Sequence, residues 1–287
     1  MSRNRDRSGM GMQPPQPEHS TAPPRALQEQ EGFSFVVPTE FVELPSRGIF
    51  YPEGHPLHNQ EAIEIKQMTA KEEDILTSRT LLKKGIALDR MLESLIRNKR
   101  IHPQNLLIGD RNAILIAARV SGYGNEYSTV VNCPNCSTKQ KYTFDLNDAN
   151  VYHGENLHEL EVTNHEDGTF TTVLPKSKMN IRFRLLTGVE EKNMIDLSDK
   201  QRKKNKQDNL ITRQLKSLVV SVNDYDTAEA IDYVVENLPS MDSRHLRSAY
   251  KLAAPNIDLS QEFECDHCGH EQEMEVPLTA DFFWPDR

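Results

Sequence analysis

The sequence predicts an α+β protein with a mostly helical body, a small antiparallel β region and a cysteine-bearing ribbon built from two distant hairpins. Apolar residues recur at helical spacing from about 69 to 120 and again from about 189 to 253. Between 159 and 187 the pattern changes to short alternating runs separated by turn residues, which is typical of antiparallel strands. Two C-x-x-C pairs, Cys133 with Cys136 and Cys265 with Cys268, each lie between short strand-like runs.

The composition is that of an ordinary globular chain and excludes several classes of protein. Its 287 residues suffice for one large domain or two smaller ones. Its 34 basic and 43 acidic side chains give a net charge of −9, which excludes an overall electrostatic footprint for DNA or RNA. It contains no apolar run of about eighteen residues, and its first twenty residues lack the apolar core of a secretory signal. We therefore expect a protein that stays in a reducing cytoplasm, where four cysteines favour metal ligation over disulfides.

The first 32 residues predict a disordered tail. They combine five prolines with Gln, Ser and Gly and contain almost no large apolar side chains, so they cannot bury enough surface to offset the entropy of ordering. Two interpretations remain open, a flexible end and a tether that folds onto a partner.

Residues 33–127 predict a strand and loop followed by helices. A Pro/Gly-punctuated loop over 44–54 precedes the alternating run Glu61–Lys66, which suits a half-buried strand. Thr69 and Glu72 have capping-box spacing at the start of the first helix. Asp110 is the expected N-cap of an almost wholly apolar, buried central helix over 112–120. The stripe expected on the helix between them is Leu88, Met91, Leu92, Leu95 and Ile96.

Residues 147–259 predict an insertion made of a β-meander and helices. The expected strands contain Leu160 and Val162, then 169–174, then 179–186, with turns at Asp167-Gly168 and at 175–178. A last helix, Asp242 to Leu252, is expected to stop before Pro255. Two earlier helical stripes are Ile211, Leu215, Leu218, Val219 and Val222, and Ile231, Val234, Val235 and Leu238.

The four cysteines predict one structural zinc site per chain. Strand, C-x-x-C and strand is the layout of a zinc knuckle, whose tight turn presents two thiolates to a metal while backbone N–H groups point at sulfur. Two knuckles complete a closed tetrahedral site. We therefore assign residues 128–146 plus 260–287 to a zinc ribbon and C-terminal aromatic tail. The expected ligands are Cys133, Cys136, Cys265 and Cys268.

The separation of the two pairs departs from compact zinc motifs. Cys136 and Cys265 are separated by 128 residues, whereas compact motifs have about 15–20. Closing the longer loop costs on the order of 2 kcal/mol more, against roughly 10–16 kcal/mol for structural zinc in peptides. The free energy of zinc binding exceeds the extra cost of closing the loop. An insertion whose ends lie together would lower that cost further.

Two alternatives to a shared zinc are isolated free-thiol pairs and a redox C-x-x-C. The redox motif requires a thioredoxin-like βαβ context, which the flanking hairpins do not supply. His267 and His270 are spare donors in the second knuckle, and we expect them to be exposed loop residues.

Two further features have a structural and an interaction reading. A basic run lacks the interleaved aromatics of a single-strand platform, so a solvated helix connection is expected there. The aromatic cluster Phe282, Phe283 and Trp284 could anchor in a partner pocket or pack on the protein's own ribbon. The basic run comprises Lys200, Arg202, Lys203, Lys204 and Lys206.

Familiar enzyme motifs are absent from the sequence. It has no H-x-E with P-C-x-x-C, no phosphate-binding G-x-x-x-x-G-K-[ST], no G-x-S-x-G and no H-E-x-x-H. His165, Glu166 and Asp167 beside Gly168 fit a surface turn. We therefore assign no catalytic residues and expect no enzyme.

Several stretches of the sequence form a recognisable series. They are Val42–Gly48, Met68–Leu76, Leu106–Asn112, Ala118–Gly124, the two cysteine pairs and Asp281–Pro285. Together they resemble the T-even-type (T4-like) bacteriophage baseplate hub and hub-assembly family, over about 35–287. The resemblance implies a non-enzymatic phage tail protein that is either a structural subunit or an assembly factor of the baseplate hub. It further implies synthesis in the host cytoplasm, a place in the virion tail baseplate, and other baseplate or tail proteins as partners.

A second function remains open from another class, a zinc-ribbon regulator that binds nucleic acid. Salt-dependent retention on DNA would favour it, because phosphate contacts release counterions. The net charge and the plain basic run argue against it. An unrecognised enzyme is a third possibility.

Overall fold

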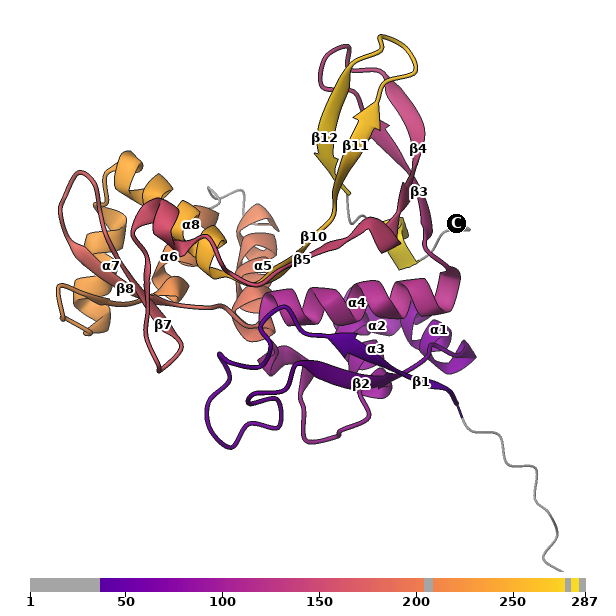
Figure 1. Ribbon diagram of the computed structural model, residues 1–287, viewed down its shortest axis with the longest axis horizontal. Helices are drawn as coiled ribbons and strands as arrows, with labels where there is room; N and C mark the ends of the chain where they lie inside the picture. The colour runs from indigo at the N-terminus through magenta and orange to yellow at the C-terminus, as the bar shows by residue number, and fades with distance from the viewer. Residues whose placement is uncertain (1–36, 204–208, 277–279, 284–287) are drawn as a thin grey trace, which may run out of the picture. The chain divides into compact units, whose positions relative to one another are not determined.

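A computed structural model describes residues 37–203, 209–276 and 280–283, and these residues confirm the α+β class (Figure 1). The described part contains eight α-helices and five small antiparallel sheets. The expected tail, 1–32, lies outside it. The helices are α1 Ala70–Thr77, α2 Arg79–Lys83, α3 Ala87–Leu95, α4 Ile108–Tyr123, α5 Gly188–Lys203, α6 Leu210–Leu218, α7 Ala228–Glu236 and α8 Ser240–Ala253. Short 3-10 turns are η1 Pro103–Asn105, η2 Leu146–Asp148, η3 Leu157–Leu160 and η4 Ala280–Phe283.

The strands form four two-stranded sheets and one four-stranded sheet, ordered β1-β2, β10-β5, β11-β12, β3-β4 and β6-β7-β8-β9. None of the helices in the described ranges is both long and apolar enough to cross a lipid bilayer. The strands are β1 Thr39–Glu43, β2 Ala62–Lys66, β3 Glu126–Asn132, β4 Lys139–Asp145, β5 Asn150–Tyr152, β6 Thr163–Asn164, β7 Thr169–Val173, β8 Asn180–Arg184, β9 Val219–Val222, β10 Asn256–Asp258, β11 Ser260–Glu264 and β12 Glu271–Glu275.

The expected capping box opens α1. The backbone N–H and the hydroxyl of Thr69 both donate to the Glu72 carboxylate, at 3.0 and 2.6 Å. The hydroxyl of Ser94 donates to the other oxygen of Glu72 at 2.6 Å, so the same carboxylate ties α1 to α3. The expected α3 stripe is also confirmed, since Met91 and Leu95 on that helix are fully buried.

The central helix α4 begins earlier than expected, and the assignment of Asp110 as its N-cap is wrong. Asp110 lies in the first turn and is fully buried. Its carboxylate accepts hydrogen bonds from the Ser46 N–H and hydroxyl, at 2.9 and 2.6 Å, and from the Tyr51 hydroxyl at 2.8 Å. It therefore holds the Pro/Gly loop on α4 instead of capping its own helix. Burial outweighs these bonds and leaves the pKa of Asp110 raised.

The four-stranded sheet contains the expected meander with two corrections. Leu160 belongs to the 3-10 turn η3, and the first strand, β6, comprises Thr163 and Asn164. Val219 and Val222, expected on a helical stripe, form the fourth strand, β9, where they pair with Phe183 and with Ile181. The reason is that a β-branched run beside the open edge of β8 gains a ladder of hydrogen bonds that continuing α6 would forfeit.

Helices α7 and α8 contact the four-stranded sheet, and α8 ends before Pro255 as expected. Phe170 and Phe183 stack on one another in the buried layer of the sheet, with ring centroids 5.5 Å apart. The Asp242 carboxylate, at the start of α8, accepts the backbone N–H groups of Lys176 and Ser177 at 2.8 and 2.9 Å. This carboxylate therefore fixes the expected turn between β7 and β8.

Candidate metal centre

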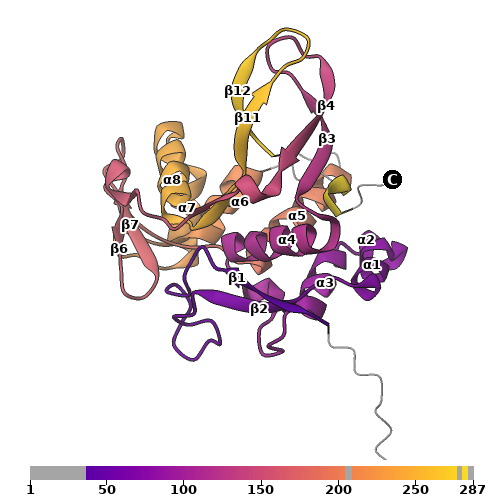
Figure 2. The same ribbon diagram turned by 45° about the vertical axis from the view of Figure 1, so that its right-hand side comes forward.

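The two cysteine pairs lie at the tips of two hairpins, as the flanking runs predicted. The first hairpin is β3-β4 and the second is β11-β12, and each pairs in antiparallel register without a break. Figures 1 and 2 show the two hairpins side by side, although more than a hundred residues separate them in the chain.

The two knuckles share one backbone geometry. In the first, the Cys133 N–H donates to the Thr138 carbonyl at 2.9 Å, and the Ser137 N–H donates to the Cys133 carbonyl at 2.8 Å. In the second, the Cys265 N–H donates to the carbonyl of residue 270 at 2.9 Å, and the Gly269 N–H donates back to Cys265 at 2.8 Å. Ser137 and Gly269 occupy equivalent positions with left-handed φ values of 57° and 62°. Glycine adopts this conformation freely, whereas serine does so at a cost.

The four cysteine sulfurs form a single cluster. All four Sγ atoms lie within 4.8 Å of one another. The Sγ atoms of Cys133 and Cys268 are 3.7 Å apart, as are those of Cys136 and Cys265, and all four thiols are free. Four sulfurs placed tetrahedrally at about 2.3 Å from a zinc ion have edges of about 3.8 Å. The described cluster could therefore hold one metal ion with little movement.

Backbone N–H groups of the first knuckle hydrogen-bond to its two sulfurs. Hydrogen bonds from the side chain and the backbone of Thr138 lower the pKa of Cys136 to about 6. The backbone N–H of Cys136 likewise favours the thiolate of Cys133, but burial and the neighbouring thiols of Cys136 and Cys265 raise the pKa of Cys133 to about 11. In the first knuckle the pKa of Cys136 is thus lowered and that of Cys133 is raised, and a divalent cation could replace the protons that these two thiols carry.

Two glutamine side chains join the hairpins. The Gln261 amide donates to the Asp145 carbonyl at 2.6 Å and accepts the Asp145 N–H at 3.1 Å. The Gln140 amide donates to the Glu264 carbonyl and accepts the Asp266 N–H, both at 3.1 Å. Each amide pairs with the opposite backbone as a neighbouring strand would. Sequence reasoning missed both residues, because the only signal is a glutamine close to each knuckle.

An aromatic contact completes the packing between the hairpins. The rings of Tyr142 and Phe263, one from each hairpin, have centroids 5.2 Å apart, and the Tyr142 hydroxyl donates to the Glu262 carbonyl at 2.9 Å. Phe263 is fully buried. The hairpins therefore share a small core of their own.

A short sheet closes the long gap between the cysteine pairs. β5, which follows the first hairpin, pairs antiparallel with β10, which precedes the second, through Asn256 with Tyr152 and Asp258 with Asn150. The ends of the insertion therefore lie together, which is the arrangement expected to lower the cost of closing the loop. Gly109 of α4 packs against this sheet so closely that a Cβ there would lie 1.9 Å from the Pro255 carbonyl oxygen.

The other singled-out residues lie outside the sulfur cluster. His267 is exposed, and the His270 ring lies 3.4 Å from the Gln272 side chain. Asp167 bonds to Arg182 and Thr169 in the turn before β7, as a surface turn would. The basic run falls on side chains of 198–203 and on residues 204–208, which are outside the described part.

The C-terminal aromatics that are described pack on the protein itself. Phe282 and Phe283 are 4% exposed, and the Phe282 ring meets Tyr127 edge-on at 5.2 Å. The buried Arg119 guanidinium donates to the carbonyls of Phe282 and Gly124, both at 2.7 Å. This packing fits the intramolecular reading for both phenylalanines, while Trp284 lies outside the described residues.

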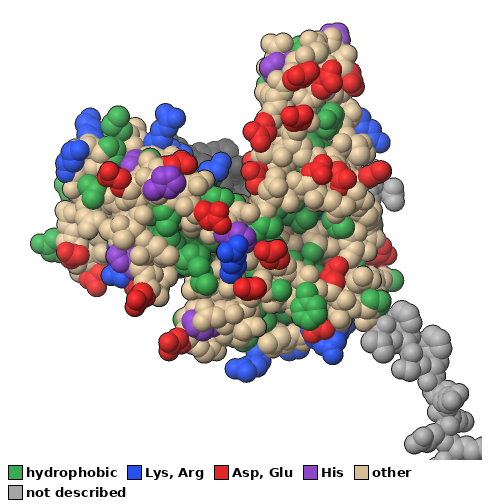
Figure 3. Space-filling view, in the orientation of Figure 1, with side chains coloured by type: hydrophobic (Ala, Val, Ile, Leu, Met, Phe, Trp, Pro, Cys, Tyr) green, Lys and Arg blue, Asp and Glu red, His purple; other side chains and the backbone are tan. Residues whose placement is uncertain are grey.

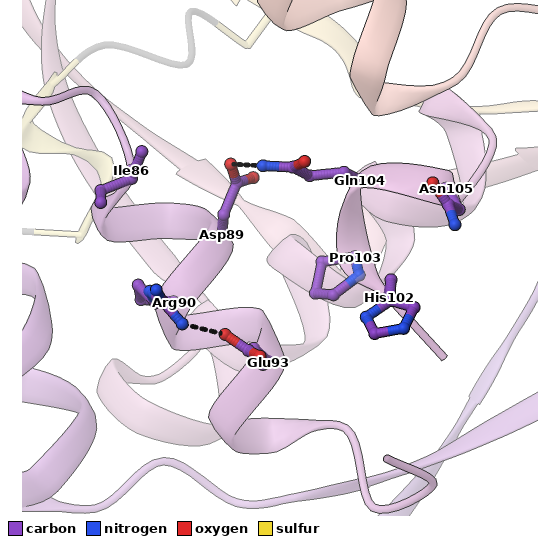
Figure 4. A pocket seen from close by; sticks show the side chains of 8 residues that line it. All are labelled: Ile86, Asp89, Arg90, Glu93, His102, Pro103, Gln104 and Asn105. Atoms are coloured by element: carbon purple, nitrogen blue, oxygen red, sulfur yellow. Dashed lines mark hydrogen bonds and ion pairs between the residues drawn. The ribbon is translucent and has the colours of Figure 1, made fainter. Parts of the chain in front are cut away.

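A polar pocket of about 340 Å³ lies between α3 and η1 (Figure 4). Within it the Gln104 amide donates to Asp89 at 3.0 Å, and Arg90 pairs with Glu93 at 2.7 Å. Asp89 also bonds to Arg111 at 3.0 Å. Burial raises the pKa of Asp89, but Gln104 and Arg111 more than offset this and leave it lowered. This carboxylate is an ionised structural link between α3, η1 and α4.

The exposed face of the second hairpin is acidic. Figure 3 shows Asp and Glu side chains gathered over the hairpins. Glu262 lies directly opposite Glu273, and Glu264 lies opposite Glu271, and all four are exposed. Such a face repels phosphate, which argues against nucleic acid as the ligand of the ribbon.

Comparison with known proteins supplies the family. The family model described as T4 bacteriophage base plate protein matches residues 41–284. No curated protein and no solved structure matches the chain significantly. The match spans most of the chain and includes both cysteine pairs and the packed phenylalanines. The chain therefore belongs to the T4 bacteriophage base plate protein family.

Proposed function

We propose that Cys133, Cys136, Cys265 and Cys268 hold one structural zinc ion that staples the two hairpins. The observation that carries this is the convergence of four free sulfurs within 4.8 Å of one another, with two of their separations, at 3.7 Å, close to the edge of a zinc tetrahedron. Four thiolates suit a soft, tetrahedral ion and leave no open position for a catalytic water. When bound, the ion would supply folding energy, and the cysteines would orient the two knuckles around it.

Metal analysis tests the zinc proposal. The purified full chain should contain about one zinc per chain. Cys133→Ser should lower the zinc content, and it should lower the free energy of unfolding by several kcal/mol. Asp266→Ala, a change at an exposed position of the second knuckle, is the matched control and should keep the zinc. A folded wild-type protein free of metal would refute the proposal, and iron in place of zinc would refute the assignment of the ion.

We propose further that the chain is a non-enzymatic structural subunit or assembly factor of the baseplate hub. The family match carries this proposal. It is supported by polar side chains among the described residues, such as Asp89, Asp110 and Arg119, whose hydrogen bonds join one structural element to another. On this proposal the protein is made in the host cytoplasm and binds other baseplate and tail proteins.

The proposal includes a division of labour along the chain. We assign residues 33–127 to the frame of strand, loop and helices, residues 128–146 plus 260–287 to the ribbon and C-terminal segment, and residues 147–259 to the insertion. In this scheme the ribbon holds the frame and the insertion in a fixed relation. The pairing of β5 with β10 at the base of the insertion supports it.

Quantitative detection in purified virions and in infected-cell lysate tests the role. A constant number of copies per particle, resistant to a high-salt wash, would establish a hub subunit. Presence in lysate and in partly assembled hubs, but not in finished particles, would establish an assembly factor. A host cytosolic protein measured in parallel controls for carry-over. Absence from both hub intermediates and particles would refute the proposal.

A further inference from the structure

The two sulfur–sulfur contacts at 3.7 Å both cross from one hairpin to the other. They join Cys133 to Cys268 and Cys136 to Cys265. A disulfide has an S–S length of about 2.0 Å, so each pair must close by only about 1.7 Å to form one. The cluster is therefore arranged to form bonds between the hairpins.

Each cross-hairpin pair couples an accessible sulfur with a buried one. Cys268 is exposed and Cys136 is half-buried, whereas Cys133 and Cys265 are buried. An oxidant in solvent therefore reaches Cys268 or Cys136 first. The buried sulfur at 3.7 Å across the hairpins is then in place to react with the oxidised one.

The hairpins have contacts that do not involve the sulfurs. The amides of Gln140 and Gln261 bond to the opposite backbones, and Tyr142 packs on Phe263. None of the atoms in these contacts would be a metal ligand. They keep the sulfurs of the two knuckles close while the thiols react.

We propose that, after loss of the metal under oxidising conditions, the cluster forms two disulfides between the hairpins, Cys133–Cys268 and Cys136–Cys265. The link between the two distant segments then survives without the ion. The biological setting rests on the proposed function, because a baseplate protein leaves the reducing cytoplasm with the virion and meets conditions in which disulfides persist.

The oxidant is hydrogen peroxide, and the chemistry balances. The Cys268 thiolate attacks one peroxide oxygen, the O–O bond breaks, and a sulfenic acid and, after protonation, water result. The Cys133 thiolate then attacks that sulfur, the S–S bond forms, and the S–O bond breaks as hydroxide leaves and takes up a proton. Two sulfurs together lose two electrons, and one peroxide becomes two waters. Cys136 and Cys265 react in the same way.

Peptide mapping of the full chain tests the pairing. Zinc content is first measured, the metal is removed with a chelator, and the protein is treated with hydrogen peroxide, blocked and digested with trypsin without reduction. Lysines such as Lys139 separate the knuckles, so a cross-hairpin disulfide joins two peptides and a within-knuckle disulfide leaves each peptide alone. We expect joined peptides and a melting temperature that falls on chelation, recovers on oxidation and falls again with a reductant.

Paired variants assign the partners. The double variant Cys133→Ser with Cys268→Ser keeps Cys136 and Cys265, whose sulfurs are 3.7 Å apart. The double variant Cys136→Ser with Cys268→Ser keeps Cys133 and Cys265, which are not one of the two proposed pairs. The first variant should cross-link several-fold faster than the second. Within-knuckle disulfides, over-oxidised thiols or equal rates would overturn the proposal. Because zinc is measured before stripping, failure of the zinc proposal would be seen separately.

Discussion

The glutamine contacts between the hairpins give a sharp energetic prediction. Gln261→Ala removes two hydrogen bonds, at 2.6 and 3.1 Å, from the backbone of Asp145 in a half-buried setting. Each such bond contributes about 1 kcal/mol net, so we expect a loss of about 2 kcal/mol. Gln140→Ala also removes two bonds, but both lie in solvent, so its loss should be about 1 kcal/mol.

Urea unfolding of metal-loaded and metal-stripped protein measures these losses. Gln272→Ala is the control, because Gln272 occupies in the second hairpin the place of Gln140 in the first, and its side chain bonds within its own hairpin, to the His270 ring at 3.4 Å. It should change stability by less than about 0.5 kcal/mol. The loss for Gln261→Ala should persist after stripping. Equal losses for Gln261→Ala and Gln272→Ala would refute the idea that side-chain amides dock the hairpins.

Three further predictions concern a knuckle, a turn and the C-terminal packing. Ser137→Gly should stabilise the protein by about 1 kcal/mol, and Gly269→Ala should destabilise it by a similar amount, because both positions have left-handed φ. In urea unfolding, a less stable Ser137→Gly or a more stable Gly269→Ala would contradict this. Burial raises the pKa of Asp242, but the two backbone N–H bonds leave it lowered, so its contribution is present above about pH 4 and is lost as pH falls through the folded value. In metal-stripped protein, the free energy of unfolding of Asp242→Asn should therefore be lower than that of the wild type at pH 6, and the gap should shrink as the pH falls to 3. A gap that does not change with pH would show that the carboxylate charge is irrelevant. Arg119→Met should cost about 3 kcal/mol in thermal or urea unfolding, because it leaves buried carbonyls without donors; a neutral result would mean that the Phe282 segment is held by its rings alone.

Features with a local signature were predictable from the sequence. Thr69 and Glu72 form the capping box because both partners lie within one helical turn. The hairpins around the cysteine pairs follow from alternation and tight turns. The convergence of the two pairs was predictable because the chemistry of thiolates and zinc favours it at any separation along the chain.

Features that depend on distant partners were not predictable. Asp110 fits the pattern of an N-cap, and only Ser46 and Tyr51, more than fifty residues away, show why it is buried instead. Val219 and Val222 continue a helical stripe, and only the open edge of β8 makes them a strand. Gln261 carries no cue to its pairing with Asp145, because hydrogen bonds across more than a hundred residues leave no spacing to detect.

Zinc-edge X-ray absorption on the purified full chain tests the central claim most directly, since it reports the atoms bound to the ion. We predict four sulfur neighbours at about 2.3 Å and no nitrogen or oxygen neighbour. A shell containing nitrogen or oxygen, fewer than four sulfurs, or no bound zinc in a folded protein would contradict a clamp made by Cys133, Cys136, Cys265 and Cys268.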